Sequence, residues 1–219
     1  MTARILVALD TTDVAAAMAQ AHAVRGLATG VKLGLEFFNA NGPAGVRQVA
    51  AAGEPVFLDL KFHDIPNTVA GAVRAVVPLR PFMLTIHVAG GAAMLRAAVE
   101  ATAAAASELG QVRPKIIGVT VLTSLNDDDL TAVGQRRPAG EQSRRLAALA
   151  QECGLDGVVC SPHEIAALRV DSGAGFTLVV PGIRPSWAAA GDQKRVMTPG
   201  EAARLGADFL VIGRPITGA

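Results

Sequence analysis

The sequence has little aromatic character, little sulfur and almost no net charge. Tyrosine is absent from its 219 residues, aromatic residues make up 4%, and cysteine occurs twice. The net charge of +1 does not favour nucleic acid or an anionic membrane as the main partner, because both attract strongly basic proteins. No apolar run approaches the roughly 18 residues that a membrane-spanning helix needs. Residues 1–4 lead into a strand-like run without a signal-peptide layout, so we expect a cytoplasmic protein.

The two cysteines, Cys153 and Cys160, have a spacing that fits no zinc or redox motif. We interpret them as small core residues that stay reduced, which also agrees with a cytosolic location. With so few aromatic residues, the core must be built mainly from Ala, Val, Leu and Ile. That composition suits buried parallel strands covered by alanine-rich helices.

Short apolar runs alternate with longer stretches of helical character along the whole chain. The runs begin roughly every 20 to 40 residues, which is typical of successive strand–helix units. Most are continuous rather than alternating, which indicates parallel strands buried on both faces. The predicted strands are Ile5–Leu9, Val31–Leu33, Pro55–Leu60, Phe82–Val88, Lys115–Leu122, Gly157–Cys160, Thr177–Val180 and Phe209–Ile212.

Helices are predicted between these strands, and two of them have strong start signals. Ser161 and Thr198 are each followed by proline and, at the third position, by glutamate, which is the pattern of a capping box. The acidic run Asn126–Asp129 is better explained as a solvated helix start than as a metal site. The predicted helices, including the two with capping boxes, are Asp13–Leu27, Pro43–Ala52, Thr68–Val77, Ala92–Leu109, Glu141–Cys153, Pro162–Leu168 and Pro199–Leu205.

Eight strands that alternate with helices over this length predict an α/β fold, a single-domain (β/α)8 barrel over residues 1–219. A doubly wound open sheet is the alternative, but it usually has a glycine-rich turn after its first strand. Here that turn, Asp10–Asp13, contains no glycine. The last predicted strand ends at Ile212, so the C-terminal helix that normally covers it is expected to be missing.

Charged residues gather where the second and third predicted strands end, which is the active-site face of such a barrel. Asp59 and Lys61 lie two residues apart and should therefore point the same way. Lys32 ends the neighbouring strand, and Asp64 follows in the loop. We expect these four side chains to form a net-neutral series of alternating charges. A simple salt bridge at the rim is the less favoured interpretation.

The charges around Lys61 indicate its chemistry. A nucleophilic lysine needs desolvation or a neighbouring positive charge. Carboxylates two residues before and three residues after Lys61 instead favour its ammonium form. We therefore expect a general acid that protonates a carbanion. His87 ends the fourth strand, and either a supporting role or a plain core role remains open for it.

The loops after the last two strands have the features of an anion site. Arg184 follows the seventh strand, and Gly213 and Arg214 follow the eighth, where barrels often bind phosphate. Arg214 supplies a bidentate donor, and Gly213 allows the backbone to approach the anion. The long polar stretch Arg184–Met197 suggests a functional lid, with a disordered surface loop as the alternative.

The stretch Phe57–Thr68, FLDLKFHDIPNT, closely resembles the signature of the orotidine 5′-phosphate decarboxylase family, in its shorter bacterial type. The resemblance covers nearly the whole chain in matching order, and the absent last helix departs from it. Further matching segments are Ala8–Asp10, Lys32–Gly34, Thr85–His87, Val121–Ser124, Pro181–Arg184, Gln193 and Ile212–Pro215.

The resemblance implies a barrel that converts orotidine 5′-monophosphate to uridine 5′-monophosphate in pyrimidine biosynthesis, without cofactor or metal. By position, it implies that Lys61 protonates the carbon that loses CO2 and that Asp59 lies near the departing carboxylate. It also implies that Asp10 and Lys32 bind the ribose. A homodimer with shared active sites is implied, in which Asp64, Ile65 and Thr68 reach the neighbouring subunit's site. The remaining implied substrate contacts are Thr123 on the pyrimidine side, Pro181, and the phosphate-binding residues Arg184, Gln193, Gly213 and Arg214.

Two alternatives of other kinds remain. A magnesium-dependent sugar-phosphate lyase or decarboxylase on a similar barrel shares the Asp-x-Lys-x-x-Asp spacing. It would have a carboxylate at the end of the second strand, where this chain has Lys32, which would repel the metal. A non-catalytic barrel that binds a phosphate ligand is the other alternative, although every charge expected for catalysis is present.

Overall fold

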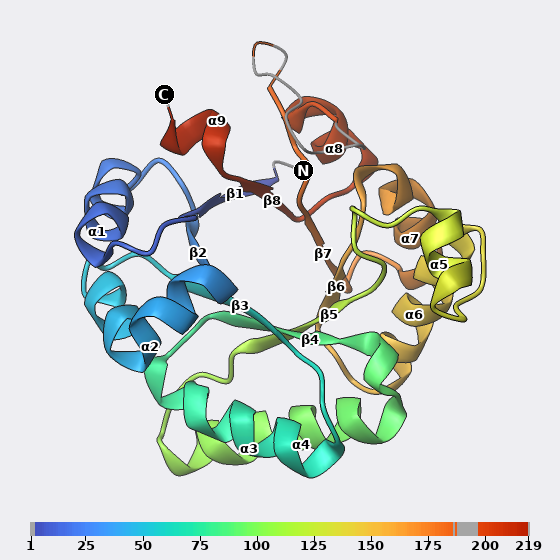
Figure 1. Cartoon of the computed structure of the whole chain (residues 1–219), viewed down its shortest axis with the longest axis horizontal. Helices are drawn as coiled ribbons and strands as arrows, with labels where there is room; N and C mark the ends of the chain where they lie inside the picture. The colour runs from blue at the N-terminus through green and yellow to red at the C-terminus, as the bar shows by residue number, and fades with distance from the viewer. Residues whose placement is uncertain (1–2, 186, 188–196, 219) are drawn as a thin grey trace.

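The computed structural model describes residues 3–185, 187 and 197–218. Eight parallel strands pair in sequence order, and β1 also pairs with β8, so the sheet closes into a barrel. Figure 1 shows the strands as an inner ring with the helices outside it. The predicted (β/α)8 barrel is therefore confirmed, and the open doubly wound sheet is wrong, because an open sheet has no pairing between its first and last strands.

The strands lie close to their predicted positions, and β7 and β8 have the predicted bounds. β5 ends at Val119, before the predicted Leu122, because Thr120 turns its hydroxyl and its N–H onto the Val159 carbonyl. The bounds are β1 Arg4–Ala8, β2 Gly30–Gly34, β3 Val56–Phe62, β4 Met83–His87, β5 Lys115–Val119, β6 Gly157–Val159, β7 Thr177–Val180 and β8 Phe209–Ile212.

The helices follow the predicted order, with one large difference at α2. This helix begins at Leu35 rather than Pro43, because Gly42, at φ 57°, joins two helical pieces across a kink. The predicted Pro162–Leu168 helix starts as a short 3-10 turn, Pro162–Glu164. The α-helices are α1 Val14–Ala23, α2 Leu35–Ala50, α3 Pro66–Val76, α4 Ala92–Glu108, α5 Asp127–Ala132, α6 Ala139–Glu152, α7 Ile165–Ser172, α8 Pro199–Leu205 and α9 Arg214–Thr217.

The predicted helix starts at Ser161 and Thr198 are confirmed, since both residues form complete capping boxes. Asn126 forms a third box, and the acidic run after it is the first turn of α5, as expected for a solvated helix start. After β8 the described chain forms the four-residue helix α9. Among the described residues, none of the helices is long and apolar enough to cross a membrane.

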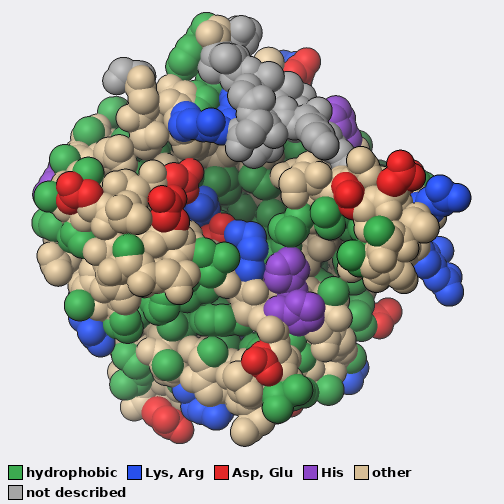
Figure 2. Space-filling view, in the orientation of Figure 1, with side chains coloured by type: hydrophobic (Ala, Val, Ile, Leu, Met, Phe, Trp, Pro, Cys, Tyr) green, Lys and Arg blue, Asp and Glu red, His purple; other side chains and the backbone are tan. Residues whose placement is uncertain are grey.

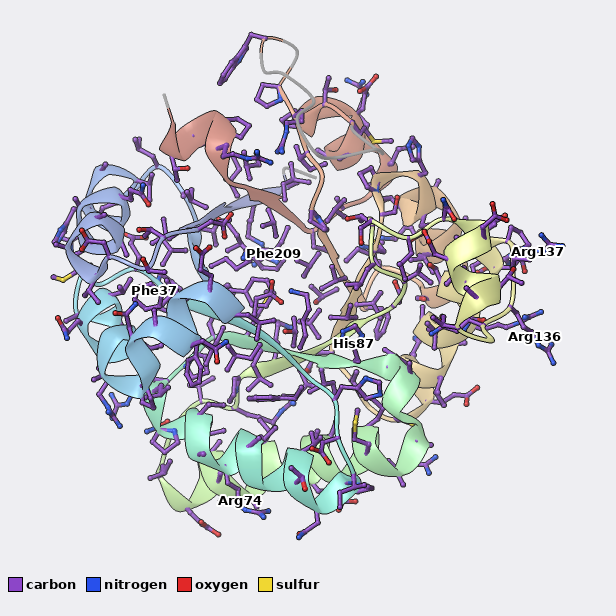
Figure 3. The ribbon with its side chains drawn as sticks, viewed as in Figure 1. Phe37, Arg74, His87, Arg136, Arg137 and Phe209 are labelled. Atoms are coloured by element: carbon purple, nitrogen blue, oxygen red, sulfur yellow. The ribbon has the colours of Figure 1, made fainter. Side chains whose placement is uncertain are left out.

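Apolar side chains pack in two layers, one inside the ring of strands and one between the strands and the helices. Phe57, Met83 and Phe209 belong to the inner layer and are almost fully buried. Phe37 of α2 belongs to the outer layer. Figure 3 shows Phe209 inside the ring, Phe37 outside it, and Arg74 at the outer edge of α3. The filled interior leaves the mouth of the barrel, at the carboxyl ends of the strands, as the place for a site.

Candidate active site

A cavity of about 290 Å³ opens at the carboxyl ends of the strands. Figure 2 looks into this mouth and shows blue and red side chains at the bottom of a hollow with green walls. Nine of the predicted site residues line the cavity: Asp10, Lys32, Asp59, Lys61, Thr123, Pro181, Arg184, Gly213 and Arg214. These residues, which are spread from position 10 to position 214, meet because each lies near or after the carboxyl end of a parallel strand, and these ends form one rim.

Four charged side chains form a continuous series across the floor of the cavity. Lys61 Nζ lies 2.8 Å from Asp59 Oδ2. Lys32 Nζ lies 3.6 Å from that same oxygen and 3.6 Å from Asp10 Oδ1. The series Asp10–Lys32–Asp59–Lys61 is net neutral and alternates in sign. Within one chain the fourth member is Asp10, and the expected Asp64 does not join the series there.

The Asp59 carboxylate is ionised although it is buried. Its side chain is only 12% exposed. Burial by itself raises the pKa of a carboxyl group, but the ammonium groups of Lys32 and Lys61 act in the opposite direction. Together with hydrogen bonds from Lys61 and Thr85, they hold the pKa of Asp59 below its ordinary value. A permanent negative charge therefore lies between two positive ones.

Lys61 has an unusual backbone conformation at the end of β3. Its φ of 51° lies in the left-handed region, which is unfavourable for a side chain with a Cβ by roughly 1–3 kcal/mol. Residues in such conformations persist only where the surrounding structure holds them, and they gather at active sites. In this conformation the Lys61 ammonium lies 2.8 Å from Asp59 Oδ2.

Gly34 gives Lys32 the room that it needs. Lys32 and Gly34 lie two residues apart on β2 and so face the same side. A Cβ at Gly34 would lie 3.2 Å from the Lys32 ammonium, which is closer than most such contacts. Glycine at this position therefore lets the ammonium stay between the two carboxylates.

His87 lies beside the site without lining the cavity. It ends β4, and its ring centroid lies 5.4 Å from that of the exposed His63. Desolvation by burial lowers the pKa of His87, and the neighbouring His63 and Lys61 act in the same direction. Figure 3 shows His87 beside β4 at the ring of strands, and Figure 2 shows histidine side chains beside the hollow. Burial therefore favours the neutral form of His87, which packs against His63 beside the rim.

Three predicted site residues lie away from this cavity, on the loop after β3 and on α3. Ile65 is 67% exposed, and Asp64 and Thr68 are also exposed. The Asp64 carboxylate accepts the Ile65 N–H at 2.6 Å, and it makes no ion pair with another described residue. Within one chain, then, this segment faces outward.

The anion side of the cavity is formed by the chain after β7 and β8. Among the described residues, Arg184 and Arg214 are the cations that line this side, and the Arg184 N–H donates to the Met197 carbonyl at 3.0 Å. This hydrogen bond joins the first and last residues of the stretch Arg184–Met197, which is the predicted lid. Gln193 and nearly all of that stretch lie outside the described residues, with Trp187, which is 71% exposed, as an exception.

The mouth has no metal site within the ranges that the structure describes, because no three His, Cys, Asp or Glu side chains there come together suitably. Each carboxylate in the series already faces an ammonium group. The arrangement can instead hold an anionic ligand against the arginines and deliver a proton from Lys61.

Comparison with known proteins assigns the family. The model of the family described as orotidine 5′-phosphate decarboxylase / HUMPS matches residues 3–219. An orotidine 5′-phosphate decarboxylase of Rhodospirillum rubrum is 57% identical over 98% of this chain and 87% of that protein. One of Paramagnetospirillum magneticum is 55% identical, over 98% of this chain and 92% of that protein.

The chain belongs to the orotidine 5′-phosphate decarboxylase / HUMPS family. A solved member, an orotidine 5′-phosphate decarboxylase from Lactobacillus acidophilus, is similar to it with a TM-score of 0.83. The two are 36% identical, and the match covers 99% of this chain and 92% of the solved one. The family resemblance of the Phe57–Thr68 signature is thus confirmed over the full barrel.

Sequence reasoning missed two residues that shape the site in this family member. Gly34 and Thr85 both lie in segments that match the family, but the sequence pattern does not predict a role for either residue. Thr85 is fully buried and bonds both Asp59 and the Lys61 backbone. The available signal was a hydroxyl in the middle of an otherwise apolar strand, two residues before His87. Such a buried hydroxyl needs partners, and the charged run at the end of the neighbouring strand was the place to seek them.

Proposed function

We propose that this barrel removes CO2 from orotidine 5′-monophosphate to give uridine 5′-monophosphate, with Lys61 as the proton donor. The observation that carries the proposal is the Lys61 ammonium, held 2.8 Å from the buried Asp59 carboxylate at the bottom of the cavity. Relatives that are more than half identical over nearly the whole chain are named orotidine 5′-phosphate decarboxylase. The reaction is a step of pyrimidine biosynthesis.

The chemistry requires an acid that acts where the carboxylate leaves. The bond between the pyrimidine carbon and its carboxylate breaks, CO2 departs, and the electron pair stays on the carbon. Lys61 Nζ then gives a proton to that carbon, which forms the C–H bond, and the neutral amine takes a new proton from water. The negative charge of Asp59 attracts the Lys61 ammonium and holds it at 2.8 Å before the reaction.

Asp59 also lies where the substrate carboxylate would be held. Two carboxylates at close range repel each other, and departure of CO2 removes that repulsion. The surrounding wall includes Val119, Val159, Val179 and Val211, which offer an apolar surface to neutral CO2. Ground-state repulsion and stabilisation of the carbanion by Lys61 therefore act in the same direction.

The rest of the cavity matches the parts of the nucleotide. We assign Asp10 and Lys32 to the ribose, Thr123 and Pro181 to the pyrimidine side, and Arg184, Gly213 and Arg214 to the phosphate. We assign Gln193 to the phosphate as well. Because the phosphate is remote from the reacting carbon, its binding energy can be used to organise the site. The free, buried Cys153 and Cys160 suit our proposal of a cytoplasmic enzyme.

The direct test is turnover with and without a chelator. We expect the ultraviolet band of orotidine 5′-monophosphate to disappear, CO2 to be released, and EDTA to leave the rate unchanged, because Lys61 supplies the proton and Lys32 occupies the position where a metal-binding carboxylate would lie. Loss of activity in EDTA with recovery on Mg²⁺ would support the sugar-phosphate alternative instead. Binding without turnover would support the non-catalytic barrel.

We further propose a homodimer in which Asp64, Ile65 and Thr68 complete the site of the partner subunit. Within one chain these residues lie exposed beside the mouth rather than in it. A two-fold pair is the commonest symmetric assembly, and the same surface of both subunits then forms the contact. Ile65, a large apolar side chain that is 67% exposed, would be covered there.

Mixing two inactive variants tests this arrangement. In a hybrid of Lys61→Ala and Asp64→Ala subunits, one of the two sites keeps both Lys61 and Asp64. Random pairing makes half of the dimers hybrids, so about a quarter of wild-type activity should return. The control pairs Lys61→Ala with Asp59→Ala, which lie in the same site, and it should show no recovery. Hybrids that form without recovery would remove Asp64 from the partner's site.

A further inference from the structure

Thr85 occupies the middle of β4 and faces the inside of the barrel. Met83, two residues earlier, belongs to the inner apolar layer, and side chains two apart on a strand face the same side. Thr85 is 0% exposed, so its hydroxyl cannot bond to solvent. A buried hydroxyl needs partners within the protein, and both of its partners belong to the charged end of β3.

The pairing of β3 with β4 is interrupted where Lys61 lies. Leu58 pairs with Leu84 and Phe62 pairs with Ile86, so four steps along β3 correspond to two steps along β4. This bulge removes the regular pairing of residues 59–61 and coincides with the left-handed backbone of Lys61. The Lys61 N–H donates instead to the Thr85 hydroxyl oxygen, at 2.8 Å.

The same hydroxyl acts on the carboxylate that faces the ammonium of Lys61. Thr85 Oγ1 donates to Asp59 Oδ1 at 2.9 Å, and Lys61 Nζ donates to Asp59 Oδ2 at 2.8 Å. The directions are fixed, because an N–H can only donate and an ionised carboxylate can only accept. A hydroxyl can do both at once. The hydrogen bonds thus form a closed ring: it runs from the Lys61 N–H to the Thr85 hydroxyl, then to the Asp59 carboxylate, and back to the Lys61 ammonium.

We propose that Thr85 is a positioning residue for the proton donor, through its bonds to the Lys61 backbone and to the Asp59 carboxylate. The inference rests on the proposed function and adds a determinant outside the cavity lining. The Lys61 backbone conformation is unfavourable on its own, and it takes the Lys61 N–H out of the regular β3–β4 pairing. The Thr85 hydroxyl accepts a hydrogen bond from this N–H in place of a strand partner. It also holds Asp59 so that its second oxygen faces Lys61.

The hydrogen bond from Thr85 is one of the influences that keep the pKa of Asp59 low, against the desolvation that raises it. The charged groups that face Asp59 are Lys32 and Lys61, and His87 lies farther along β4. Loss of the hydroxyl should therefore raise the pKa of Asp59 while leaving those groups in place.

The test compares Thr85→Val, which keeps the shape and removes the hydroxyl, with Thr85→Ser, which keeps the hydroxyl. Thr102→Val is the matched control, because Thr102 is also 0% exposed and its hydroxyl donates to the Ala98 carbonyl of its own helix, at 2.6 Å. Rates with orotidine 5′-monophosphate are measured across pH, together with circular dichroism and thermal unfolding. Hydrogen exchange of the Lys61 amide is followed by NMR.

For Thr85→Val we expect kcat to fall about 100-fold with little change in KM, the size that misplacement of a catalytic group produces. The acid limb of the rate profile should move to higher pH, and protection of the Lys61 amide should be lost. Thr85→Ser should recover most of kcat and the protection. Thr102→Val should lower thermal stability and leave kcat and the pH profile unchanged.

A folded Thr85→Val enzyme with wild-type kcat and pH profile would overturn the proposal, as would a Thr85→Ser enzyme that fails as badly as Thr85→Val. If Thr85→Val does not fold, the wild-type measurement decides: a Lys61 amide that exchanges as fast as an exposed loop amide contradicts the proposed bond. Failure of the wild-type enzyme to turn over orotidine 5′-monophosphate would instead overturn the proposed function, and the amide measurement would still report on Thr85.

Discussion

Lys61→Ala is expected to abolish turnover of orotidine 5′-monophosphate, with kcat lower by about 10⁴-fold or more, the upper range for a general acid. The reason is geometric. The Lys61 ammonium is directed by its left-handed backbone and by Asp59, 2.8 Å away, to the bottom of the cavity. Water cannot reproduce a proton donor held in that position. Single-turnover release of CO2 should fall in parallel with loss of the ultraviolet band.

The control for this variant is Lys115→Ala. Lys115 begins β5, so it lies at the opposite end of the barrel from the mouth. Its replacement removes the same side chain and the same charge from the protein, and it should leave kcat and KM close to those of the wild type. Substantial activity in a folded Lys61→Ala enzyme would refute Lys61 as the proton donor.

Asp59→Asn is expected to reduce kcat by about 10²- to 10³-fold, the range seen when one preorganised electrostatic group is removed. The amide keeps the shape of the side chain but leaves Lys32 and Lys61 without the negative charge between them. Removal of one member of a buried ion pair also costs about 3 kcal/mol of folding free energy. Both effects follow from the low exposure of the Asp59 side chain, 12%.

The stability effect should depend on pH in a defined direction. The pKa of Asp59 is lowered in the folded state, so its contribution to stability is present above the unfolded value of about 3.9 and is lost as the pH falls through the folded pKa. The difference in unfolding free energy between wild type and Asp59→Asn should therefore be full near neutral pH and shrink below about pH 4.

Denaturant unfolding at several pH values measures this difference, and Asp171→Asn is the control. Asp171 also accepts hydrogen bonds from a cation, Arg144, at 2.6 Å, but on the exposed surface. Solvent screens such pairs, so its replacement should change stability little at any pH. An Asp59→Asn enzyme that is as stable and as active as the control would contradict the central role of Asp59 in the series.

The strand order, the barrel and the family could be predicted from the sequence because their signals are local. Continuous apolar runs define buried parallel strands, and the period of two places Asp59 and Lys61 on the same side. Capping residues at Ser161 and Thr198 define helix starts by bonds that reach only three residues along the chain. The first half of α2 was missed because Gly42 and Pro43 interrupt the helical pattern.

The remaining features depend on contacts between distant segments. The sequence could not show that Asp10 joins Lys32 and Asp59 in the series of charges, because that depends on how the carboxyl ends of β1, β2 and β3 converge. Neither the bulge between β3 and β4 nor the left-handed backbone of Lys61 has a local signal, since no glycine marks the position.

By itself, the sequence therefore determined the fold and the family, and it predicted the run Asp59–Asp64 as the chemical centre, with Lys61 as an ammonium between carboxylates. The tertiary structure decided how that centre is assembled. It places the inward face of β4 beside the end of β3. The Thr85 hydroxyl therefore accepts a hydrogen bond from the Lys61 N–H and donates one to the Asp59 carboxylate. The physical reason is that a hydrogen bond between residues 24 positions apart arises from strand register, which only the closed barrel defines.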